Sequence, residues 1–144
     1  MAVTIGGDLR VRGDAPSGEG WRIGVADPDD HTRELAQLRV LDGRVATSSI
    51  RRRRWWHDGA SVHHLLDPDT GKPAATGVVQ STVVAGTGVW AEIWSKAIVV
   101  RGIAVVHPVL EQLGLAAMSV CADGTTHCTT TWGPYRTLHS EVNG

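Results

Sequence analysis

The sequence contains no phenylalanine, no long apolar run and no excess of charge of either sign. No stretch reaches the roughly 18 apolar residues that a membrane span needs, and the N-terminus lacks the charged and then apolar segments of a signal peptide. Fourteen Lys and Arg residues face fifteen Asp and Glu residues, so no global field selects nucleic acid or an anionic membrane. These absences predict a cytoplasmic chain with no membrane span, although export of a longer form stays open.

Cysteine is also scarce, with only Cys121 and Cys128 in the chain. If Asp123-Gly124 forms a two-residue hairpin turn, Cys121 lies opposite Thr126 and Cys128 opposite Ser119. The two thiols are then not directly opposed, and no disulfide is expected. Their spacing also lacks the CxxC or Cys/His pattern of a zinc site. The sequence therefore predicts reduced thiols without a structural metal.

Strand patterns dominate the first part of the chain. A strand over 1–5 is interrupted at Gly6-Gly7-Asp8, for which a β-bulge is the local interpretation, and resumes at 9–11. Further strands are expected at 21–25, 35–41, 44–47, 50–57, 60–66, 78–85, 115–121 and 126–131. The dipeptides Asp42-Gly43 and Asp58-Gly59 predict hairpins between successive strands.

Helical spacing appears only in the second part of the chain. Val89, Ile93, Ala97 and Val100 recur with the period of a helix, with Thr87 as its N-cap. Gly102 ends this helix, and a second is expected over 104–113, weakened by Pro108. This order predicts an α+β fold with a largely antiparallel sheet and a helical pair on one face. One domain is expected over residues 1–132, followed by a loosely ordered tail at 133–144.

A polar loop follows the two adjacent histidines of the expected 60–66 strand. Its sequence, over residues 63–73, is His-His-Leu-Leu-Asp-Pro-Asp-Thr-Gly-Lys-Pro. Proline fixes one φ angle and Gly71 can adopt a positive φ, so the loop is predicted to be rigid. It brings imidazole, carboxylate and hydroxyl groups together, as polar sites do. On local grounds a capped turn explains the same residues.

Other motifs have competing interpretations. Arg51–Trp56 combines arginines with stacking rings, but on a strand the arginines divide between both faces. Nucleic-acid binding is therefore not expected, whereas one arginine on a phosphate is plausible. His63 and His64 point to opposite faces, which disfavours zinc. Glu92 and Lys96 have the spacing of a surface ion pair.

Trp90 and Trp94 share one face of the first helix, since they are separated by four positions. They are expected to cover the sheet or a ligand ring, with core packing favoured. Serine and threonine residues at 47–49 and 81–82 lack the surroundings of a hydrolase nucleophile. Neither motif alone identifies a function.

The order of these motifs resembles the later half of the FAD:protein FMN transferases, the ApbE family. The similarity runs from about Ala2 to Thr131. It is carried by IGGDLRVRG (5–13), WRIGV (21–25), VATSS (45–49), HHLLDPDTGKP (63–73), STVVA (81–85) and AEIWSKA (91–97). The resemblance implies part of the ApbE-type T-fold. It also implies a magnesium-dependent transfer of FMN from FAD to a threonine of a target flavoprotein, with release of AMP.

The resemblance also implies roles for individual residues. Gly6, Gly7 and Asp8 match the segment that helps to form the flavin pocket. His64 matches the histidine placed near the FAD phosphates and tied to catalysis, and the loop residues Asp67 and Thr70 match those that shape the site. A histidine beside a pyrophosphate can stabilise developing charge or relay a proton.

Three departures from the family pattern bear on activity. Glu92 stands where the family has a metal-binding aspartate, and Lys96 where it has a threonine or alanine that contributes an oxygen to magnesium. Ser48-Ser49 replaces Ser-Gly. The family's earlier half, with a lysine-containing helix that holds FAD, has no counterpart in this chain. The alternatives to a transferase are therefore a non-catalytic flavin-binding module, half of a split enzyme completed by a partner chain, or an interaction domain covered by a second copy of itself.

Overall fold

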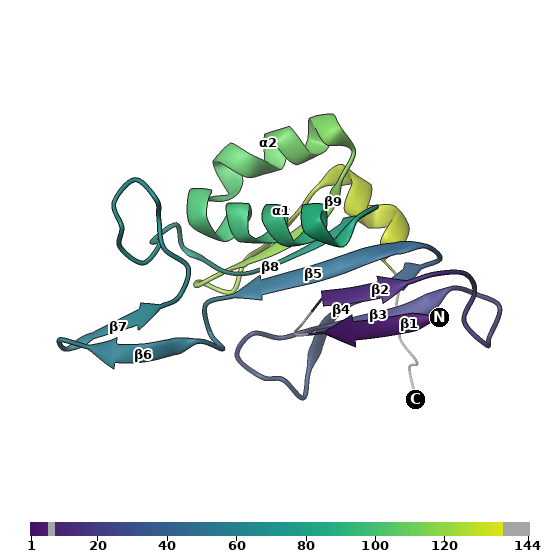
Figure 1. Ribbon diagram of the computed structural model, residues 1–144, viewed down its shortest axis with the longest axis horizontal. Coiled ribbons are helices and arrows are strands. Elements are labelled where there is room, and N and C mark those ends of the chain that lie inside the picture. Colours follow the sequence, from purple (N-terminus) through teal and green to yellow (C-terminus); the bar gives the residue numbers. More distant parts are fainter. Residues whose placement is uncertain (6–7, 137–144) are drawn as a thin grey trace.

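The computed structural model describes residues 1–5 and 8–136 as three layers (Figure 1). A six-stranded sheet forms the middle layer, two helices cover one of its faces, and a pair of strands covers the other. The sheet has the order β1-β2-β5-β8-β9-β10, and all its neighbours are antiparallel. Its strands are β1 (Ala2–Ile5), β2 (Asp8–Val11), β5 (Gly43–Ser49), β8 (Val78–Ala85), β9 (Ala116–Cys121) and β10 (Thr126–Cys128). The α+β prediction with a helical pair on one face is confirmed.

Strand β8 is the centre of the molecule, because all eight of its residues are buried. Its β-branched composition suits a strand that packs on both faces. Val83 belongs to the core beneath the helices, whereas Val84 belongs to the core on the opposite face. The two-residue period of a strand thus divides one run of valines between two cores.

Helices α1 (Gly88–Arg101) and α2 (Ile103–Leu113) lie over the sheet (Figure 1). The Thr87 hydroxyl caps α1 by accepting a hydrogen bond from the Trp90 amide at 3.3 Å. Ala91, Ser95 and Ile98 are fully buried against the sheet. Gly102, with φ of 86°, separates the two helices, and α2 continues through Pro108 to a left-handed Gly114.

The third layer consists of β3 (Trp21–Ala26) and β4 (Glu34–Val40), which pair only with each other among the described strands. The hairpin expected at Asp42-Gly43 is therefore wrong. β5 already has β2 on one edge and β8 on the other, so no edge remains for β4. The turn instead takes the chain from one layer to the next.

Strands β1 and β2 also differ from the prediction, which interrupts and resumes a single strand. Ile5 lies opposite Asp8 in an antiparallel pair, so the chain has reversed direction between them. A Gly-Gly pair between two short strands is also a hairpin signal in sequence. Gly6 and Gly7 themselves lie outside the described residues.

A separate two-stranded ribbon, β6 (Arg54–His57) and β7 (Ala60–His63), extends away from the three layers (Figure 1). The predicted Asp58-Gly59 turn is confirmed, with φ of 48° and 76° at its two residues. The first strand is shorter than expected, because β5 ends at Ser49 and the chain bends over residues 50–53. The expected split of the arginines between two strand faces is consequently wrong for residues 51–53.

The C-terminal hairpin is offset by one residue from the prediction. Thr126 pairs with Val120 and Cys128 with Met118, which leaves the three residues 122–124 in the loop. The cysteines remain unpaired, as expected. A 3-10 helix, η1 (Thr130–Tyr135), replaces the end of the predicted strand and buries Trp132. It includes the first residues of the segment expected as a tail, and residues 137–144 lie outside the described part.

No helix within the described ranges is long and apolar enough to cross a membrane.

Candidate functional site

A polar cavity of about 320 Å³ lies where the sheet, helix α1 and the base of the β6–β7 ribbon meet. Strand β2 contributes its first residue, β5 its last three, and α1 two charged residues one turn apart. The bend after β5 and the residue after β7 complete the wall. The lining residues are Asp8, Thr47, Ser48, Ser49, Arg52, Arg53, His64, Glu92 and Lys96.

The cavity gathers charges of both signs. Arg52, Arg53 and Lys96 supply three cations, against the carboxyl groups of Asp8 and Glu92. Burial raises the pKa of the Asp8 carboxyl, the negative charge of Glu92 raises it further, and Lys96 acts in the opposite direction. Five charged residues from three separate parts of the chain thus line one cavity, and the charges of Glu92 and Lys96 act on Asp8.

Lys96 and Glu92 form an ion pair within α1, one turn apart. This confirms the pairing expected from their spacing. The spacing did not reveal that both side chains line a cavity. Ser95, between them, is fully buried and donates a hydrogen bond to the Glu92 carbonyl at 3.0 Å. Because that bond uses the only Ser95 hydroxyl proton, Ser48 donates in the 2.8 Å contact between the two serine oxygens. These bonds fix α1 against β5 beside the cavity.

The residues present do not fit a magnesium ion in this arrangement. Magnesium requires several oxygen ligands in near-octahedral geometry. Within residues 1–5 and 8–136, no cluster of three or more His, Cys, Asp or Glu side chains is arranged to hold a metal. Glu92, which the resemblance assigns to the metal, instead contacts the Lys96 ammonium group. Lysine offers no lone pair while it carries its proton, so it cannot replace the missing ligand.

His63, the last residue of β7, and His64, the residue after it, have different surroundings, as expected for adjacent histidines. His63 is buried, and its Nε2 lies 3.0 Å from the Ala74 carbonyl oxygen. His64 is exposed and lines the cavity, with its Nδ1 3.3 Å from the Arg53 carbonyl oxygen. Only the second histidine can therefore meet a ligand in this cavity.

The loop at 65–73 forms the capped turn that its sequence predicts. Asp67 accepts hydrogen bonds from the Asp69 amide at 3.0 Å and from the Thr70 hydroxyl at 3.4 Å. Arg101, at the end of α1, pairs with Asp69 and lies 3.6 Å from Asp67. Its guanidinium holds the pKa of the Asp69 carboxyl below its ordinary value. Neither Asp67 nor Thr70 lines the cavity, so the structure does not bring these two predicted residues to His64.

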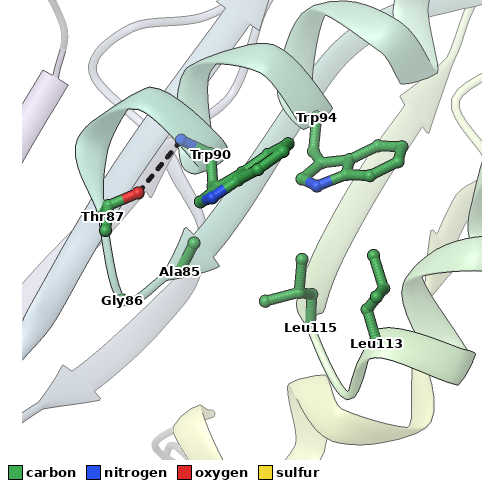
Figure 2. A pocket seen from close by; sticks show the side chains of 7 residues that line it. All are labelled: Ala85, Gly86, Thr87, Trp90, Trp94, Leu113 and Leu115. Atoms are coloured by element: carbon green, nitrogen blue, oxygen red, sulfur yellow. Dashed lines mark hydrogen bonds between the residues drawn. The ribbon is translucent and has the colours of Figure 1, made fainter.

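A second cavity, of about 300 Å³, is apolar and lies beside the first half of α1 and the start of β9 (Figure 2). Trp90 and Trp94 stack with their ring centroids 6.4 Å apart, and Leu113 and Leu115 lie below them in this view. Core packing was expected for both indoles. It holds for Trp94, which packs against the buried cluster of α1, α2 and β8. It is wrong for Trp90, which is 53% exposed.

Sequence reasoning located part of the polar cavity and missed the rest. Asp8, His64 and Glu92 are the predicted site residues that meet there. For Arg52 and Arg53, the sequence analysis predicted only that one arginine of the 51–54 run could bind a phosphate. A strand was assumed where the chain bends, and the bend turns both side chains toward one cavity. Gly6 and Gly7, predicted for the flavin pocket, lie outside the described residues.

Sequence comparison relates the chain to known flavin transferases. The model of the ApbE family matches residues 1–119. The FAD:protein FMN transferase of Salmonella typhimurium is 31% identical over 123 residues, which cover 85% of this chain and 35% of that protein. The Escherichia coli K12 protein of the same name is 30% identical over the same length. The chain therefore spans about a third of the length of these relatives.

Solved structures agree with the sequence matches. The ApbE protein of Thermotoga maritima superposes with a TM-score of 0.85 and 29% identity, covering 96% of this chain and 45% of that one. The flavin transferase ApbE of Vibrio cholerae gives a TM-score of 0.78 and 27% identity, covering 93% and 43%. The family match over most of the chain and the shared fold lead to one conclusion: this chain belongs to the ApbE family.

Proposed function

We propose that the chain is the later part of an FAD:protein FMN transferase, which moves FMN from FAD to a threonine of a target flavoprotein and releases AMP. The observation that carries the proposal is the polar cavity, where Arg52, Arg53 and Lys96 bring positive charge beside His64. Guanidinium and ammonium groups are the usual protein partners of phosphate oxygens. A pyrophosphate linking two nucleotides matches this arrangement.

The contact of His64 with the Arg53 backbone leaves its second ring nitrogen available for a general base. A carbonyl oxygen can only accept a hydrogen bond, so His64 Nδ1 donates to Arg53. The neutral ring then keeps its lone pair on Nε2. In the proposed reaction Nε2 takes the proton of the acceptor threonine hydroxyl as that oxygen bonds to the FMN phosphorus. The bond from this phosphorus to the bridging oxygen breaks, and AMP leaves with the electron pair. The nearby cations stabilise the charge that develops on the phosphate oxygens.

The other proposed site residues act around this centre. Asp8 follows the Gly6-Gly7 pair that we assign to the flavin, and it lines the same cavity as His64. Asp67 and Thr70 shape the turn after His64 through hydrogen bonds to their own loop. Arg101 joins that turn to α1, the helix that carries Lys96. We therefore expect these loop residues to position the site rather than to touch FAD.

A flavin-binding half that needs a partner chain is the second candidate. The curated relatives extend well beyond the matched region, since the chain covers 35% of their length. A second copy of this chain or a separate chain could complete the cavity. Flavin would then bind without transfer until the partner is added.

In-gel flavin fluorescence tests the transfer. The chain is mixed with FAD and a flavoprotein that carries an acceptor threonine, once with magnesium and once with EDTA. We expect covalent flavin on the acceptor, and His64→Ala should reduce the rate by about 100-fold or more, as loss of a general base does. His57→Ala is the matched control, because His57 lies exposed on the ribbon and outside the cavity.

The result separates the candidates. Full activity of His64→Ala would contradict the assignment of His64. Flavin that copurifies with the wild-type chain without transfer would support the binding half, and the absence of both would contradict both candidates.

A further inference from the structure

We propose that the polar cavity binds a diphosphate without a divalent cation, with the Lys96 ammonium group in the place of the metal. The inference rests on the proposed function, because FAD supplies the diphosphate. It goes beyond that function by assigning the source of positive charge. The resemblance implies that Glu92 and Lys96 each replace a metal ligand. On this proposal the two replacements act together, because Lys96 supplies the positive charge that the metal would supply.

The position of Lys96 is the first argument. Its ammonium group contacts Glu92, and both side chains are about half exposed at the cavity, at 45% and 47%. A metal ion bound by the Glu92 carboxylate would lie beside this ammonium group and be repelled by it. The ion pair and the metal therefore compete for the same carboxylate.

Charge is the second argument. Lys96, Arg52 and Arg53 carry three permanent positive charges, whereas Asp8 and Glu92 provide at most two negative ones. A cavity with this excess attracts a multiply charged anion without help from a metal.

An ordinary surface ion pair is the competing explanation for Glu92 and Lys96. Such pairs are common at this helical spacing and contribute little. Two features set this pair on α1 apart: it lines a cavity with two arginines, and its charges act on the carboxyl group of Asp8, which belongs to strand β2. A surface pair without function would leave ligand binding unchanged when it is removed.

Calorimetric titration with inorganic pyrophosphate in EDTA tests the proposal directly. We expect the wild-type chain to bind, and Lys96→Ala to weaken binding by about tenfold or more through loss of a charge-assisted contact. Lys72→Ala is the matched control, because Lys72 is the other lysine of the chain and does not line the cavity. Lys96→Arg should bind more tightly than Lys96→Ala, since it restores the charge. Circular dichroism verifies that each variant is folded.

Glu92→Gln is informative because the two explanations predict effects under different conditions, one in EDTA and the other in magnesium. Removing the carboxylate frees Lys96, so pyrophosphate should bind more tightly in EDTA. If Glu92 were a metal ligand, the same change would instead abolish a magnesium-dependent increase in affinity. Electron paramagnetic resonance with manganese should detect no specific site in the wild type.

These outcomes separate this proposal from the transferase assignment. Pyrophosphate binding that requires magnesium, that is equal in Lys96→Ala, or that is absent from the wild type would overturn the proposal. Metal-free binding that depends on Lys96 would support it even if the chain transferred no flavin. Magnesium-dependent flavin transfer would retain the transferase and refute only the role of Lys96.

Discussion

Ser95 connects the sheet to the cavity through a single hydroxyl group. It is fully buried, it contacts Ser48 of β5, and it donates to the carbonyl of Glu92. Ser95→Ala should destabilise the fold by about 1 to 3 kcal/mol, because the buried Ser48 hydroxyl loses its acceptor. Chemical denaturation, compared with that of the wild type, measures this loss.

The double variant Ser48→Ala/Ser95→Ala provides the control for this contact. Removing both polar groups leaves no unsatisfied hydroxyl, so the double variant should be less destabilised than the sum of the two single variants. Strict additivity of the two effects would mean that the serines do not interact.

Arg52 and Arg53 show why residue-scale prediction was incomplete. The sequence allows each arginine to be assigned to a face only when its secondary structure is known. His64 directly follows the last residue of β7, so it continues the alternation that buries His63 and it lines the cavity. The bend at 50–53 follows from where β5 stops pairing with β8, which is a property of the assembled sheet.

At the scale of elements, α2 packs on β9 through a histidine that is sensitive to pH. His107 Nε2 lies 3.0 Å from the hydroxyl oxygen of the fully buried Ser119. Burial lowers the pKa of His107, His127 lowers it further, and Glu111 acts in the opposite direction. The folded chain thus binds this proton less readily than the unfolded chain does.

Acid should therefore destabilise the contact between α2 and β9. The contribution of His107 is fully present above its unfolded pKa of about 6.5, and it is lost as the pH falls toward the folded pKa. Denaturation at pH 7.5 and at pH 5.5 should show a larger loss of stability in the wild type than in His107→Gln. Equal losses in the two proteins would exclude His107 as the source.

The elements themselves were largely predictable, whereas their pairing was not. Local patterns located β8, both helices and the Asp58-Gly59 turn, because each depends on neighbouring residues. Asp42-Gly43 has the same local signal as Asp58-Gly59, yet it joins two layers rather than two paired strands. β2 and β8 occupy the two edges of β5, so β4 cannot pair with it. A local sequence pattern does not contain this information.

For the whole molecule, the core on the face opposite the helices joins the six-stranded sheet to the β3–β4 pair. The β6–β7 ribbon does not contribute to it. Leu38 of β4, Val84 of β8, Met118 of β9 and Trp132 of η1 belong to one buried cluster. Leu38→Ala should cost about 2 to 5 kcal/mol. It should shift the urea midpoint equally by tryptophan fluorescence and by far-ultraviolet circular dichroism, because the layers unfold together.

Leu41→Ala serves as the control for this experiment. Leu41 is three positions away but 59% exposed, so its truncation should change stability by less than about 0.5 kcal/mol. Two separate transitions in Leu38→Ala would show instead that the β3–β4 layer unfolds on its own.

The ion pair on α1 also has a consequence for chemical labelling. Lys72 and Lys96 are the only lysines in the chain, and only Lys96 lines the polar cavity. A nucleotide whose ribose has been oxidised to a dialdehyde forms an imine with a primary amine. Inside the cavity, such a reagent would find a single lysine, at a known position on a rigid helix. Lys96 thus also provides a defined attachment point for mapping what the cavity holds.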